Sequence, residues 1–278
     1  MEGYQEILVH MPLAGGDATL RVGVEIAKQD EAHLTGVASL PESAMLRTVT
    51  KTPFMNPSEE EIAKVSDAEA REAKAAEKRF TEAADAAGVT HSWMIGEGDS
   101  ADVLLQACRL QDLVVVEQST PGADLLWGPA VQMALSGYPT LVVPKKWDGP
   151  VARKHAIVAW NGSVQAAAAL RKAMPLLKHT EEVTLLVGPS QETLPDTLRV
   201  PAPDPLAYMK RHGVNATKYD KQIPGADAGA QILKIAEEKS ADLIVMGAFG
   251  RSRFREWVLG GATRHVMANS KIPALMAH

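Results

Sequence analysis

Glycine spacing in the last quarter of the chain points to phosphate chemistry. An apolar run over residues 243–246 ends in a glycine-rich segment. Its glycines are Gly247, Gly250, Gly260 and Gly261. Glycines let a ligand approach main-chain N–H groups without an intervening Cβ, and a helix starting near Ala262 would add unpaired N–H groups and a positive dipole end. The spacing predicts a phosphate site, although glycines after a strand also form tight turns.

Apolar runs alternate with amphipathic helical patterns along the whole chain. The runs that we predict to be strands cover residues 6–10, 33–38, 90–95, 113–116, 139–144, 156–160, 183–187, 215–219, 243–246 and 273–276. Continuous apolar strands that alternate with helices are typical of parallel sheets covered on both faces. The sequence therefore predicts an α/β fold with doubly wound sheets, in which one strand feeds the glycine-rich segment.

The two halves of the sequence share short motifs near their ends. Residues 112–116 (DLVVV) correspond to residues 242–246 (DLIVM), and residues 138–143 (YPTLVV) correspond to residues 272–276 (IPALM). A tandem duplication explains this agreement. A polar, turn-rich segment around Trp147 separates the halves, so we predict two domains, at residues 1–146 and 151–278.

Composition narrows the classes of function. The 278 residues are 46% hydrophobic and 23% charged, an ordinary globular composition with length for about two domains. The net charge of -5 argues against a general binder of nucleic acids or anionic membranes. No segment approaches the ~18 apolar residues of a membrane span. A single cysteine, Cys108, is expected to be buried and fits a reducing compartment, so we expect a cytoplasmic protein.

These motifs resemble those of the universal stress protein family. They are a strand followed by Asn161-Gly162-Ser163, an M-G-x-x-G sequence at residues 246–250 with nine residues before a glycine pair, and Pro273 before the last strand. The resemblance covers both halves and is closer in the second. It implies two tandem domains, each a five-stranded parallel sheet with helices on both faces, in a protein that is usually dimeric. The last strand of each domain would lie at a sheet edge and pair either across the halves or between chains.

The resemblance also implies an adenine-nucleotide site in the second domain. Family members that bind ATP carry a glycine, two residues, a second glycine, nine residues, and a third glycine followed by Ser or Thr. Gly247, Gly250 and Gly260 fit this spacing. Gly261 stands where the hydroxyl is expected, and a hydroxyl recurs at Thr263. The residues expected to form the site are Trp160, Asn161, Val187, Met246, Gly247, Gly250, Arg251, Gly260, Gly261, Ala262 and Thr263.

Three of these residues have alternative roles that the sequence leaves open. Asn161 sits where the family often has an acidic residue beside the nucleotide, and it serves equally well as a turn former before Gly162. Trp160 either flanks an adenine or closes the core. Arg251, like the arginines that follow it, either neutralises phosphate charge or belongs to a solvated face.

The first domain departs from the pattern where the second has its glycines. Glu117 replaces Gly247, and Pro121 and Pro129 remove backbone donors nearby. A glutamate at this position would repel an anionic phosphate. We therefore expect the first domain not to bind ATP in the manner of the family.

We expect a stress-response protein whose second domain binds ATP, with or without Mg²⁺, or a related adenine nucleotide, as a binding or regulatory module. The sequence has no lysine-bearing P-loop, no metal-ligand cluster and no evident general base in the glycine segment. We thus assign no catalytic residues, and any ATP hydrolysis would be weak. The main alternative is a nucleotide-free structural dimer of the same family. An adenylating enzyme of related fold would need a longer pyrophosphate loop than residues 161–163 provide.

Overall fold

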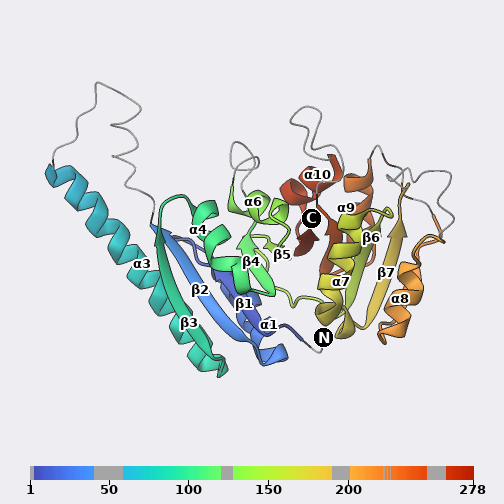
Figure 1. Cartoon of the computed structure of the whole chain (residues 1–278), viewed down its shortest axis with the longest axis horizontal. Coiled ribbons are helices and arrows are strands. Elements are labelled where there is room, and N and C mark those ends of the chain that lie inside the picture. The colour runs from blue at the N-terminus through green and yellow to red at the C-terminus, as the bar shows by residue number, and fades with distance from the viewer. Residues whose placement is uncertain are drawn as a thin grey trace. The chain divides into compact units, whose positions relative to one another are not determined.

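The chain folds into two compact units, which we describe separately. The computed structural model describes residues 3–40, 59–119, 128–189, 201–221, 223, 225, 227–248 and 261–278, with residues 59–66 described by their backbone alone. One unit comprises Tyr4–Glu117, and the other comprises Met1–Gly3 and Gln118–His278. Both are built from strands and helices in alternation, as Figure 1 shows. The α/β fold class predicted from the sequence is confirmed.

The first unit contains four parallel strands in the order β3-β2-β1-β4. These are β1 (Glu6–His10), β2 (His33–Leu40), β3 (His91–Glu97) and β4 (Leu113–Glu117). The helices are α1 (Asp17–Asp30), α3 (Glu59–Ala87) and α4 (Ser100–Ala107), followed by the 3-10 turn η1 (Cys108–Leu110). Cys108 is fully buried, as expected.

Helices cover both faces of this sheet. A Cβ on Gly36 of β2 would lie 2.7 Å from the Phe80 ring of α3, so the strand needs glycine where this helix packs. A Cβ on Gly96 of β3 would instead collide with Val103 of α4. Because neighbouring residues of a strand point to opposite faces and Gly36 pairs with Trp93 in β3, these two glycines lie on different faces. The helices α3 and α4 therefore cover opposite sides.

The second unit contains six strands, in the order β5-β10-β9-β6-β7-β8. Its strands are β5 (Thr140–Val143), β6 (His155–Trp160), β7 (Glu182–Val187), β8 (Ala216–Lys218), β9 (Leu243–Gly247) and β10 (Ala274–Ala277). Its helices are α6 (Pro129–Leu135), α7 (Val164–Lys178), α8 (Pro205–Arg211), α9 (Ala228–Glu238) and α10 (Gly261–Asn269). The five strands from β10 to β8 are parallel.

The antiparallel pair of β5 and β10 joins the last strands of the two sequence repeats. Leu141 pairs with Leu275, and Thr140 pairs with Met276. Of the two arrangements that the sequence left open, the structure shows pairing within the chain. This pairing also explains why α6 and β5 belong to the compact unit of the second repeat. The domain boundaries at residues 146 and 151 describe the sequence repeat and stay a prediction.

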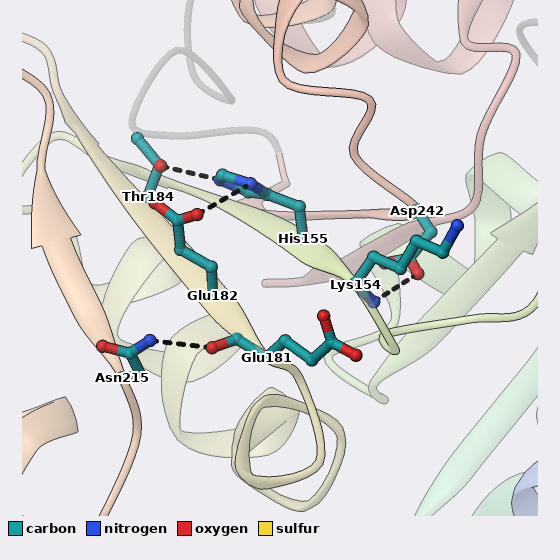
Figure 2. Close-up of polar contacts among 7 residues, drawn as sticks. All are labelled: Lys154, His155, Glu181, Glu182, Thr184, Asn215 and Asp242. Carbon is teal, nitrogen blue, oxygen red and sulfur yellow. Dashed lines mark hydrogen bonds and ion pairs between the residues drawn. The ribbon is translucent and has the colours of Figure 1, made fainter.

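An aspartate fixes the start of the central strand in each repeat. Asp112 Oδ2 accepts hydrogen bonds from the backbone N–H groups of residues 5 and 6, at 2.8 and 3.1 Å. Asp242 Oδ2 accepts two such bonds from residues 153 and 154, at 2.9 and 2.8 Å, the second drawn in Figure 2. Both aspartates begin the matching motifs of the sequence. The repeat is therefore visible in hydrogen bonding as well as in residue type.

A polar cluster surrounds His155 at the start of β6, as Figure 2 shows. The Nε2 atom of His155 lies 2.8 Å from Thr184 Oγ1, and its Nδ1 atom lies 3.6 Å from Glu182 Oε2. Burial lowers the pKa of His155, and the opposing effect of Glu182 is smaller. This cluster sits at the amino ends of β6 and β7. It anchors strands and takes no part in a site at their carboxyl ends.

His10, the last residue of β1, is a buried histidine of a different kind. Its Nε2 atom has no hydrogen-bond partner within the described parts of the chain. Burial lowers the pKa of His10 from 6.5 to about 4. Since the folded-state pKa lies below the unfolded value, the stability gained from the neutral imidazole is present above pH 6.5 and is lost as the pH falls toward 4.

We expect His10→Leu to remove this loss of stability in acid. Between pH 7 and pH 4.5 the free energy of unfolding of the wild type should fall by about 2 kcal/mol more than that of the variant. Urea denaturation at the two pH values measures the difference. An equal fall in both proteins would show that His10 does not titrate in this way.

The crossing of α9 and α10 depends on Gly229. A Cβ at this position would lie 2.7 Å from His265 Cβ and 3.0 Å from the Ala262 carbonyl oxygen. We expect Gly229→Ala to separate the two helices and to lower the free energy of unfolding by roughly 1–3 kcal/mol. The matched control is Gly261→Ala, whose Cβ would meet nothing within 4 Å. Thermal unfolding of both variants tests the contact, and equal melting temperatures would contradict it.

Candidate functional site

A cavity of about 300 Å³ lies at the carboxyl ends of three strands of the second unit. Strand β6 has β7 on one side and β9 on the other. The chain adds β7 and β8 on one side of β6 and then crosses to the other side for β9, which makes the gap between β6 and β9 the topological switch point of these strands. Ligands of open α/β sheets bind in the crevice at such a switch point. The strand ends that line the cavity are Ala159, Trp160, Leu186, Met246 and Gly247.

Two helix N-termini meet at this cavity. The first turn of α7 contributes Ser163 and Gln165, and the first turn of α10 contributes Gly261, Ala262 and Thr263. The dipoles of both helices give this end of the cavity a positive potential. The arrangement suits an anionic ligand group.

Gly247 allows β9 to end against the start of α7. A Cβ on Gly247 would lie 2.6 Å from the Ala166 backbone nitrogen and 2.8 Å from the Gln165 carbonyl carbon. The sequence pattern assigned this glycine to ligand approach. The structure gives it a packing role, because only glycine lets the strand and the helix backbone come this close.

Asn161 forms the turn that begins α7. Its Oδ1 atom accepts hydrogen bonds from the Ser163 N–H at 3.2 Å and from the Ser163 hydroxyl at 2.7 Å. The Ser163 hydroxyl in turn accepts the Ala166 N–H at 3.1 Å, which caps the helix. The turn-forming role left open by the sequence is therefore observed. The Asn161 Nδ2 group is the part of this side chain with donor capacity for a ligand.

The walls of the cavity combine apolar side chains with polar groups. Trp160 is half-buried and lines the cavity, so it does not close the core completely. Leu186 and Gly188 line it on either side of Val187, whose carbonyl oxygen accepts the Ile223 N–H at 3.1 Å. The remaining lining residues are Pro189, Ile223, Gly225, Ala228 and Ile232. Sequence reasoning missed these five because they carry no motif.

The cavity lining contains no charged side chain among the described residues. Arg264 and His265 are exposed on α10. Gly250, Arg251 and Gly260, which were predicted to contact the ligand, lie outside the described residues. Within the ranges that the structure describes, no three His, Cys, Asp or Glu side chains are grouped as metal ligands.

The equivalent position of the first repeat is occupied by a carboxylate. Strand pairing aligns Leu113 with Ile7 and Leu243 with Ala156, which makes Glu117 the counterpart of Gly247. The Glu117 Oε2 atom accepts the Gly16 N–H at 3.3 Å. Gly16 is the N-cap of α1 and has a left-handed φ of 82°. A protein carboxylate thus sits at the helix start that corresponds to α7.

Comparison with known proteins relates the chain to one family. The model of the universal stress protein family matches residues 152–278. Universal stress protein MJ0577 of Methanocaldococcus jannaschii is 39% identical over 46 residues, which cover 16% of this chain and 28% of that protein.

Solved structures share the fold over the whole chain. A universal stress protein from Archaeoglobus fulgidus has a TM-score of 0.71 at 16% identity and covers 98% of this chain and 96% of its own. A functionally unknown protein from Pseudomonas aeruginosa has a TM-score of 0.57 at 14% identity, with 99% and 93% covered.

None of the helices that the structure describes is both long and apolar enough to cross a bilayer. The resemblance noted in the sequence is confirmed by the family match and by the fold. Residues 152–278 of this chain match the universal stress protein family, and the whole chain has a fold similar to that of a solved universal stress protein.

Proposed function

We propose that the second repeat binds ATP or a related adenine nucleotide in the cavity between β6, β9 and the starts of α7 and α10. The observation that carries this proposal is the convergence of two helix N-termini on one cavity at the switch point of the sheet. Such an arrangement supplies backbone donors and positive potential for phosphates. The family match over residues 152–278 supports it.

In this proposal the phosphates lie at the first turn of α10. The backbone N–H groups of Gly261 and Ala262 and the hydroxyl of Thr263 donate to them, and Gly250, Arg251 and Gly260 complete the phosphate side. Mg²⁺, where present, enters with the phosphates. The apolar wall around Leu186 and Met246 faces the base, since most small-molecule sites combine apolar walls with a few polar groups.

We further propose that the protein works in the cytoplasm as a binding or regulatory module of the stress response. Its net charge of -5 argues against a nucleic acid or an anionic membrane as the partner. A nucleotide-free structural dimer of the same family is the alternative. Release of nucleotide on denaturing the purified protein, followed by mass spectrometry, favours the first reading over the second.

Isothermal titration calorimetry with ATP, ADP, AMP and GTP, each with and without Mg²⁺, tests the proposal. We expect saturable binding of at least one adenine nucleotide and weaker binding of GTP. Absence of heat with all adenine nucleotides, for a protein that is folded by circular dichroism and carries no nucleotide, would overturn the proposal.

Two substitutions at Gly261 test the phosphate position. A Cβ at Gly261 meets nothing within 4 Å, so Ser and Asp should both be accommodated. We expect Gly261→Ser to tighten ATP binding about fivefold by adding one hydroxyl donor. We expect Gly261→Asp to weaken it at least tenfold, because a carboxylate repels phosphate at the same place. Calorimetry of the three proteins gives the dissociation constants.

The melting temperature of the Gly261→Asp variant serves as the control, because it separates lost ATP binding from a damaged helix. An acidic residue in the first turn of a helix is favourable, so Gly261→Asp should keep or slightly raise the melting temperature while it loses ATP. If both substitutions leave ATP affinity unchanged, the phosphates do not lie at the start of α10.

A further inference from the structure

Strand β3 ends the strand order of its sheet and presents an outer edge. The N–H of Leu34 donates to the Thr90 carbonyl, and the N–H of Gly98 donates to the Leu40 carbonyl, both at 2.9 Å. Residues 90 and 98 therefore point their backbone groups toward β2. The direction of the backbone N–H and C=O groups alternates from one residue of a strand to the next. The odd-numbered residues from 91 to 97 therefore point their N–H and C=O groups away from β2, toward the outer edge.

The strand itself, as the structure describes it, is not short and carries neither lysine nor proline. Natural edge strands are short, or carry lysine or proline. The residues of β3 are His-Ser-Trp-Met-Ile-Gly-Glu, without lysine or proline. Met94 is 41% exposed and Ile95 is 45% exposed, one on each face of the strand. Strand β8, at the other end of the strand order, has three residues and carries the exposed Lys218.

We propose that two copies of this chain associate by antiparallel pairing of β3 with β3 about a twofold axis at Met94. Within the described residues, no strand pairs with the outer edge of β3. A second copy supplies an edge with the same spacing of donors and acceptors, and an antiparallel pair satisfies both. Closed twofold dimers are the commonest soluble assemblies.

The position of the axis follows from the backbone and from the charges. If the twofold axis passes through a residue, residues whose backbone groups point away from β2 lie opposite residues of the same kind, and the two strands can form hydrogen bonds. If the axis passes between two residues, each such residue lies opposite one whose backbone groups point toward β2, and these hydrogen bonds cannot form. An axis at Met94 places Trp93 opposite Ile95 and His91 opposite Glu97 of the second copy. All residues of β3 are then paired, and the ends carry complementary groups. Moving the axis to Trp93 or Ile95 leaves residues unpaired and separates His91 from Glu97.

The side chains near the axis add to the interface. Met94 meets its own copy at a non-hydrogen-bonded position, where the Cα atoms of an antiparallel pair approach to about 4.5 Å. Aromatic and branched side chains opposite each other stabilise such pairs, as Trp93 and Ile95 do here. One strand per chain buries on the order of 1,000 Å² in total, the lower limit of specific interfaces. The dimer should therefore dissociate on dilution.

Sedimentation velocity over a concentration series, without nucleotide, tests the proposal. We expect a monomer–dimer equilibrium for the wild type. Met94→Lys places two like charges together at the axis and should raise the dimer dissociation constant about tenfold or more. The control is Leu110→Lys, because Leu110 is 87% exposed at the end of η1 and lies outside β3. This control should dimerise like the wild type.

Cysteine crosslinking fixes the register. The one native cysteine, Cys108, is buried, so an introduced cysteine is the exposed thiol. Met94→Cys should form an intermolecular disulfide on mild oxidation, because its Cα separation falls in the range that disulfides span. Leu110→Cys should stay reduced. A wild type that is monomeric at all concentrations, or a dimer that survives Met94→Lys and is not crosslinked through Met94→Cys, would overturn the proposal.

Discussion

The site of this protein depends on the close approach of the end of β9 to the first turn of α7. Gly247 makes this approach possible, since a Cβ there would lie 2.6 Å from the Ala166 nitrogen. The approach brings the carboxyl end of the strand and the positive end of a helix to one cavity. The α10 N-terminus joins them because Gly229 lets α10 lie tightly against α9. Two glycines thus shape the proposed binding site through the backbone packing that they allow.

The two repeats use this architecture differently. Both fix the central strand with an aspartate, at Asp112 and Asp242. They differ at the next strand end, where the first repeat has Glu117 and the second has Gly247. In the first repeat the carboxylate accepts a hydrogen bond from the helix N-cap Gly16. The protein itself therefore provides an anion at the position where the second repeat has room for a ligand.

The fold could be predicted from the sequence because the hydrophobic periodicity indicates the strands and helices, and the repeated motifs indicate the two halves. The run predicted at residues 6–10 is β1 without change. Pairing of β5 with β10 was left open, since pairing within a chain and between chains satisfies the same edge.

The site was harder to predict. Apolar wall residues such as Ile223 and Ile232 come from segments without a motif, and they meet only through the fold. Asn161 fits both a ligand contact and a turn until its hydrogen bonds to Ser163 are known. The packing role of Gly247 depends on a contact with α7 that lies far away in the sequence.

We propose that the second repeat is open to a nucleotide and that the first is closed by its own carboxylate. Native mass spectrometry of the wild type with excess ATP measures this directly, because it counts the ligands bound to each chain. We expect one nucleotide per chain at saturation. Two nucleotides per chain would contradict the closure of the first repeat by Glu117, and none would contradict the proposed site in the second.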